Sequence, residues 1–104
     1  MARPLRDTSL KGFEEKAAVA ASMLKALGNE KRLMILCKLL DQGEMSVMAL
    51  TNEVGLSQSA LSQHLAKMRE ENIVGFRRDA QQIFYHVSDP RIREIISTLK
   101  TVYC

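Results

Sequence analysis

One stretch of ten residues, Leu56–Leu65 (LSQSALSQHL), constrains the fold more than any other. It follows Gly55, which ends a helical apolar stripe formed by Val47, Leu50 and Val54. Ser57 can cap a new helix that runs to about Glu71, with an inward stripe of Leu61, Leu65 and Met68. Two short helices joined by so tight a turn predict a helix–turn–helix, whose second helix enters the major groove of DNA.

Upstream of this pair, the apolar pattern predicts two more helices. From Phe13, apolar residues recur at helical spacing until Gly28, a residue type that often ends helices. Asn29 can cap a second helix over about Glu30–Asp41, whose middle is apolar on nearly every side. A helix with that pattern is expected to be buried.

Downstream of residue 72, the apolar period changes from that of a helix to that of a strand. Ile73–Arg78 and Ile83–Val87 predict two strands joined by a short turn at residues 79–82. Asp89 followed by Pro90 then begins a last helix, because Asp is a good cap and Pro fits the first helical position. This order of elements predicts a mainly α fold with a small β-hairpin, a winged helix–turn–helix.

The terminal helices predict how the chain is organised. We expect residues 1–12 to form a flexible tail and residues 13–104 to form one DNA-binding and dimerisation domain. The N- and C-terminal helices carry apolar faces that the helix–turn–helix does not need, so we expect a homodimer through them. Two copies of the recognition helix then match the half-sites of a near-palindromic operator in double-stranded DNA.

Composition agrees with one folded domain, since the 104 residues are 46% hydrophobic and 26% charged. The longest apolar run, Leu33–Cys37, is too short to span a membrane, and the first residues lack the apolar core of a signal peptide. We therefore expect a cytoplasmic protein without membrane contact. The net charge of +3 permits an anionic partner without requiring one.

The polar face of the predicted recognition helix and the basic hairpin supply the candidates for DNA contact. Gln can pair with adenine through two hydrogen bonds, Ser can contact most base edges, and Arg suits phosphates or the minor groove. The candidate residues are Ser57, Gln58, Ser59, Ser62, Gln63 and Lys67 on the helix and Arg77, Arg78, Gln81 and Gln82 on the hairpin. The alternative is an ordinary solvated face. His64 flanks the apolar stripe, so we expect it to pack or hydrogen-bond rather than to contact a base.

The two cysteines, Cys37 and Cys104, do not form a disulfide framework of the kind found in secreted domains. From the residues alone they are buried thiols, metal ligands or a redox pair. A thiol enzyme is not expected, because the chain has no CxxC, no arrangement of nucleophile, His and acid, and no Gly-rich phosphate loop.

Three stretches together resemble the ArsR/SmtB family of dimeric winged-helix repressors: LKALGNEKRLMIL at 24–36, LSQSALSQHLAKMRE at 56–70 and RRDAQQIFYHV at 77–87. The resemblance covers about residues 18–104. It implies a homodimer that binds operator DNA and releases it when an inducer binds. By position in the motif, it also implies base contacts by Gln58, Ser59, Ser62 and Gln63.

The metal sites of that family are not matched by this sequence. One such site places two Cys at the start of the third helix, where this chain has Ser46 and Met48. Another uses Asp and His pairs on the last helix, where this chain has Asp89 but no His. We therefore expect no metal site and no cofactor.

The placement of the cysteines resembles the persulfide-sensing BigR/SqrR branch of the family and the HlyU-like regulators. The matching segments are RLMILC, which ends at Cys37, and LKTVYC, which ends at Cys104. The resemblance implies a dithiol repressor that leaves its operator when reactive sulfur species or oxidants link the two thiols. Alternatives are a repressor that senses a metal or haem, and a DNA-binding regulator without a small-molecule inducer.

Overall fold

A computed structural model describes residues 10–104 of the chain. Four of its helices begin at the predicted caps, whose side-chain oxygens accept a backbone N–H two or three residues further on: Asn29, Ser46, Ser57 and Asp89. The helix that starts after Ser46 ends at Gly55. Gly55 has a φ of 68°, in the left-handed region that glycine adopts without strain. Local chemistry therefore sets most of the boundaries that the sequence predicts.

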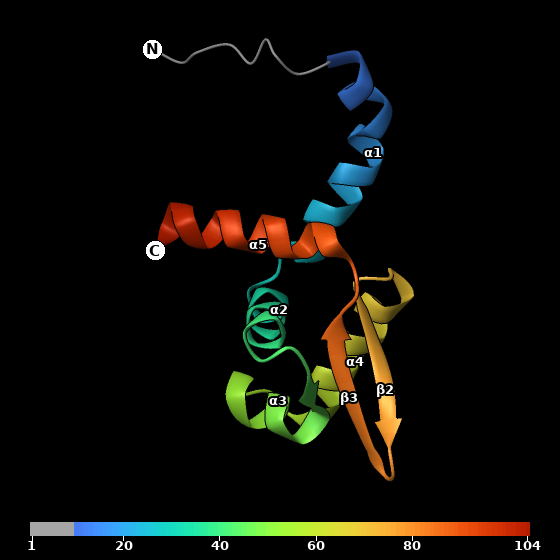
Figure 1. Cartoon of the computed structure of the whole chain (residues 1–104), viewed down its shortest axis with the longest axis vertical. Helices are drawn as coiled ribbons and strands as arrows, with labels where there is room; N and C mark the ends of the chain where they lie inside the picture. Colours follow the sequence, from blue (N-terminus) through green and yellow to red (C-terminus); the bar gives the residue numbers. More distant parts are fainter. Residues whose placement is uncertain (1–9) are drawn as a thin grey trace.

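The described part of the chain forms five helices and a three-stranded antiparallel sheet (Figure 1). The helices are α1 (Leu10–Leu27), α2 (Glu30–Gln42), α3 (Val47–Val54), α4 (Gln58–Glu70) and α5 (Pro90–Tyr103). The strands are β1 (Met45–Ser46), β2 (Val74–Asp79) and β3 (Gln82–Val87), in the sheet order β1-β3-β2. This is the predicted winged helix–turn–helix, with α3 and α4 as the paired helices and β2–β3 as the wing.

The N-terminal boundary differs from the prediction. Residues 1–9 of the expected tail lie outside the described residues, and the expectation that residues 10–12 belong to the tail is wrong, because α1 already begins at Leu10. Leu10 and Phe13 are one turn apart, so they extend the apolar stripe of the helix upstream. A glycine inside a helix lowers its stability by about 1 kcal/mol relative to alanine, and α1 forms despite Gly12.

The sheet also differs in detail from the prediction. The wing strands reach Asp79 and Gln82, which pair with each other, so the turn is reduced to Ala80 and Gln81. Ala80 takes a positive φ of 57° in this turn. The short strand β1 was not predicted, because two residues are too few to show a period, yet Met45 pairs with Tyr85 of β3.

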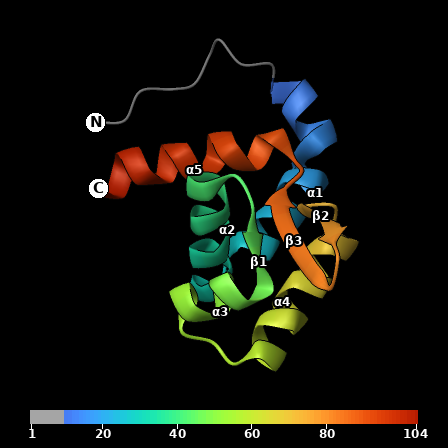
Figure 2. The same cartoon turned by 60° about the horizontal axis from the view of Figure 1, so that its bottom comes forward.

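Helix α2 lies at the centre of the core, between α5 on one side and the α3–α4 pair on the other (Figure 2). Its side chains Ile35, Leu36 and Leu39 have no solvent exposure. The predicted inward stripe of α4, formed by Leu61, Leu65 and Met68, is likewise buried. Helix α5 contributes Ile92 and Ile96 to the same core. Helix α1 extends away from this body, and only its last turn is buried (Figure 1).

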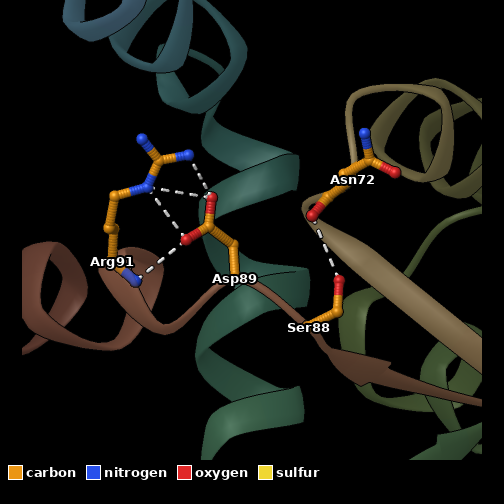
Figure 3. A network of polar contacts seen from close by, with 4 residues as sticks. All are labelled: Asn72, Ser88, Asp89 and Arg91. Atoms are coloured by element: carbon orange, nitrogen blue, oxygen red, sulfur yellow. Dashed lines mark hydrogen bonds and ion pairs between the residues drawn. The ribbon is translucent and has the colours of Figure 1, made fainter.

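The junction between the wing and α5 is held by polar contacts (Figure 3). Asp89 caps α5 by accepting from the backbone N–H of Arg91, and it also accepts from the guanidinium of Arg91 at 2.7 Å. This ion pair lowers the pKa of the Asp89 carboxyl through hydrogen bonding from Arg91. Ser88 donates its hydroxyl to the carbonyl of Asn72, two residues after the end of α4. The start of α5 is thus fixed against the loop that follows α4.

The turn at Gly55 can be tested by substitution. We expect Gly55→Ala to lower the free energy of unfolding by about 1–2 kcal/mol, because a Cβ is strained in the left-handed region. Gly55→Asn is expected to lose less, since Asn visits that region more readily. Urea denaturation at one protein concentration measures both. Equal losses for the two variants would contradict this account of the turn.

Candidate nucleic-acid interface

The first residues of α4 and the tip of the wing border one groove. Gln58 and Ser62 line it from α4, and Gln81 and Gln82 line it from the wing. The groove has a volume of about 330 Å³ and is open to solvent. The structure therefore brings together four of the predicted DNA-contacting residues, which lie on two elements separated in sequence. Both elements present amide groups that can reach base edges or phosphates.

Sequence reasoning missed Met48, which borders the same groove from the first turn of α3. Its side chain is 76% exposed, which is unusual for a methionine in a folded domain. An exposed apolar side chain beside Gln58 suits contact with the methyl group of thymine. From the sequence alone, Met48 stands out only because it occupies a position where the family's metal site has a cysteine.

A second polar stripe on α4 faces solvent outside this groove. Ser59, Gln63 and Lys67 follow one another at four-residue spacing and are all exposed. Ser57 differs from the other candidates, because its hydroxyl accepts from the backbone N–H of Ala60 and so caps the helix. Its oxygen therefore also helps to fix the start of the helix.

The adjacent wing arginines have different surroundings. Arg77 donates to both carboxylate oxygens of Glu44, at 3.0 and 3.1 Å from Nε, and its guanidinium lies 4.6 Å from the ring centroid of Phe84. The hydrogen bonds from Arg77 lower the pKa of the Glu44 carboxyl. Arg78 has no ion pair within residues 10–104. Of the two predicted phosphate contacts, Arg78 is the free cation, whereas Arg77 is fixed to the loop before β1.

The other end of the recognition helix is attached to the wing through aromatic contacts. The guanidinium of Arg69, near the C-terminus of α4, lies 4.5 Å from the ring centroid of Phe76 on β2. That ring in turn lies 5.9 Å from the ring of Tyr85 on β3. Cation–π and aromatic contacts of this kind fix the wing relative to α4.

His64 forms a hydrogen bond, as expected, and its partner is on α2. The Nε–H of Arg32 donates to Nδ1 of His64 at 3.2 Å, and Nη1 of Arg32 donates to the carbonyl of Ala26 at 3.3 Å. Burial, and then repulsion from Arg32, lower the pKa of His64 below its usual 6.5. One guanidinium thus joins the last turn of α1 to the middle of the recognition helix.

The two cysteines belong to neighbouring helices and are not bonded to each other. Cys37 is half-buried on α2 and lines a hollow that α5 completes with Ser97 and Lys100. Cys104 is exposed at the end of α5, where its N–H donates to the carbonyl of Lys100. Four residues of helix rise about 6 Å, so Cys104 lies about one turn beyond the residue that faces Cys37.

Among residues 10–104 there is no cluster of three or more His, Cys, Asp or Glu side chains that could hold a metal ion. Within the same range, no helix is both long and apolar enough to cross a membrane.

The contact between Arg32 and His64 predicts a pH dependence. The fold favours the neutral imidazole, because Nδ1 must accept a hydrogen bond, so this contribution to stability is present above pH 6.5 and is lost as the pH falls through the lowered pKa. We expect the stability difference between the parent and His64→Gln to narrow as the pH falls from about 7.5 to about 5. Denaturant titrations across this range measure it. A difference that does not vary with pH would contradict the assignment.

Comparison with known proteins identifies the family. The sequence matches the family described as "Bacterial regulatory protein, arsR family" over residues 29–75. The HTH-type transcriptional regulator YgaV of Escherichia coli (strain K12) is 46% identical over 97 residues, which are 93% of this chain and 98% of YgaV.

Two solved structures show the same relationship. Reduced HlyU from Vibrio cholerae N16961 has a TM-score of 0.83 at 46% identity, covering 91% of this chain and 99% of HlyU. The transcriptional repressor BigR from Xylella fastidiosa has a TM-score of 0.88 at 36% identity, covering 93% of this chain and 98% of BigR. This similarity, over nearly the whole of each chain, shows that the protein is a DNA-binding transcriptional regulator rather than an enzyme, and that it belongs to the arsR family, in the branch that contains BigR and HlyU.

Proposed function

We propose that this chain is a homodimeric repressor that binds a near-palindromic operator and is released when reactive sulfur species or oxidants link Cys37 and Cys104. The observation that carries the proposal is the position of the two thiols. Cys37 faces α5 across a shared hollow, and Cys104 ends α5 about one turn further on. A bond between them would join the central helix to the last helix of the same subunit.

The dimer part of the proposal is supported by apolar surface on the terminal helices. Several large apolar side chains there are more than half exposed: Leu10, Phe13 and Leu24 on α1, and Val102 and Tyr103 on α5. Exposed apolar surface on both terminal helices is typical of a protein–protein interface. A two-fold dimer through α1 and α5 covers it and presents two copies of α4 to DNA.

The DNA part of the proposal is supported by the exposed polar stripes of α4. Gln58 and Ser62 border the groove beside the wing, and Ser59, Gln63 and Lys67 face solvent next to them. We assign base contacts to the Gln and Ser side chains and phosphate contacts to Lys67 and Arg78. Gln81 and Gln82 contact the backbone or the minor groove from the wing.

The regulatory part follows from the geometry of a bridge. A disulfide requires Cα atoms within about 7 Å of each other, whereas a bridge with extra sulfur atoms spans more. Either bridge pulls the end of α5 towards α2. Because α5 belongs to the proposed dimer interface, its displacement changes the spacing of the two recognition helices, and a changed spacing weakens binding at both half-sites together. The related HlyU from Vibrio cholerae has been solved in a reduced form, which supports a redox-responsive regulator.

The two wing arginines provide a matched test of the DNA-binding surface. We expect Arg78→Ala to weaken binding to an operator fragment selected in vitro by the parent protein. The slope of the logarithm of the binding constant against the logarithm of the salt concentration (the salt slope) should fall in magnitude by about 1. Arg77→Ala is expected to lower the slope less, because Glu44 already neutralises that guanidinium. Binding titrations over a range of salt concentrations measure both. A larger loss of salt slope for Arg77→Ala than for Arg78→Ala would instead assign the phosphate contact to Arg77.

The thiol pair is tested by release from DNA. We expect Cys37→Ser and Cys104→Ser to bind the selected operator fragment with the affinity of the reduced parent, and neither to be released by polysulfide. Gel shifts with and without tetrasulfide, paired with intact-mass spectrometry, measure release and the bridge together. Release of either variant would refute the bridge, and a parent that stays bound after bridging would support a regulator without this inducer.

A further inference from the structure

The hollow beside Cys37 is a polar pocket with its own arrangement of charges. It has a volume of about 250 Å³ and lies between α2 and α5. The residues that line it are Cys37, Leu40 and Asp41 from α2 and Arg93, Ile96, Ser97 and Lys100 from α5. A half-buried thiol therefore shares a pocket with two cations and one carboxylate.

The two cations of this pocket are free to bind a ligand. Within residues 10–104, neither Arg93 nor Lys100 forms an ion pair. Two nearby cations do: Lys38, next to Cys37 in sequence, lies 3.3 Å from Glu53, and Arg91 lies 2.7 Å from Asp89. With Asp41 counted, the pocket keeps an excess of one positive charge, which favours an anion.

The same face of α5 leads to the second thiol. Arg93, Ser97, Lys100 and Cys104 are separated by four, three and four residues, the spacing of one helix face. The two cations therefore lie on the side of α5 that faces Cys37 and continues to Cys104. An anion held by Arg93 and Lys100 lies against Cys37 and about one helical turn from the end of α5.

We propose that Arg93 and Lys100 bind an anionic sulfane-sulfur donor, a persulfide or polysulfide anion, beside Cys37. This inference rests on the proposed function and names the class of inducer that the site accepts. The pocket binds the donor through its charge, so neutral oxidants of similar size gain nothing from it. Selectivity for sulfur anions then comes from the two cations as well as from the thiols.

The chemistry of this step balances. The Cys37 thiol reacts with RSS⁻ to give Cys37–S–S⁻ and RSH, the thiol proton passing to the leaving thiolate. The Cys104 thiol then attacks the Sγ of Cys37, forms the disulfide and releases HS⁻. The sulfane sulfur is reduced to sulfide and the two thiols are oxidised. Lys100 lines the pocket at Cys37 and precedes Cys104 by four residues on α5, so it is placed to stabilise the anion at each stage.

The test compares probes that differ in charge. In the full-length Cys104→Ser variant, only Cys37 reacts, and its rate is measured with anionic 5,5′-dithiobis(2-nitrobenzoate) and with neutral 4,4′-dithiodipyridine. We expect the double substitution Arg93→Gln, Lys100→Gln to lower the ratio of the anionic to the neutral rate about five- to tenfold. Asp41→Asn is expected to raise the ratio, and Lys38→Gln, whose ammonium is held by Glu53, is the control expected to leave it unchanged.

The sulfur donors themselves form the second arm. The rates with inorganic tetrasulfide and with glutathione persulfide are followed by intact-mass spectrometry in the same variants. A loss with both donors assigns recognition to the sulfur anion, and a loss with glutathione persulfide alone assigns it to the carboxylates of the organic carrier. An unchanged probe ratio in the double variant, or an equal fall in Lys38→Gln, would overturn the proposal. Since these rates do not depend on DNA, they stand apart from a failure of operator release.

Discussion

The burial of α2 is the constraint on which the rest of the structure depends. Ile35, Leu36 and Leu39 have no exposed surface, and α2 contacts α1, α3, α5 and β3. Burying each of these side chains contributes about 1.5–3 kcal/mol, so α2 cannot move alone without losing much of the stability of so small a domain. Any movement of the other helices is therefore a movement relative to α2.

Residues of α2 contact the proposed recognition helix, α4, and also line the proposed sensing pocket. Arg32, in its first turns, hydrogen-bonds to His64 of α4, and Cys37, further along, faces α5. Arg32 also holds the last turn of α1 through the carbonyl of Ala26. In the proposed mechanism, a bond to Cys37 therefore anchors α5 to the element that sets the position of α4, and the dimer interface has to adapt.

Much of the fold could be predicted from short-range chemistry. Asn29, Ser46, Ser57 and Asp89 cap their helices as their side chains indicate, and Gly55 adopts the positive φ that the turn requires. These features depend on only a few neighbouring residues. The predicted tail extends too far, because the apolar stripe that the sequence shows from Phe13 already begins at Leu10. Strand β1 was missed because it depends on pairing with β3, far away in sequence.

The candidate sites were predicted less completely, because they depend on contacts between distant residues. The separation of 33 residues between Glu44 and Arg77 hides the ion pair that distinguishes Arg77 from Arg78. The pocket around Cys37 needs the crossing of α2 and α5, which no local pattern encodes. By contrast, the exposure of Gln58 and Ser62 follows from helical periodicity once the inward stripe of α4 is known.

The central claim is that linking the thiols changes the distance between the two recognition helices of a dimer. A genetically encoded spin-label amino acid at Ala66, which is exposed on α4, leaves both native thiols intact. Pulsed electron–electron double resonance then measures the distance between the two labels of a dimer. We predict a distance distribution in the reduced protein that fits half-sites about 34 Å apart, and a shift of that distribution after tetrasulfide treatment. An unchanged distribution in protein whose intact mass confirms the bridge would contradict the account.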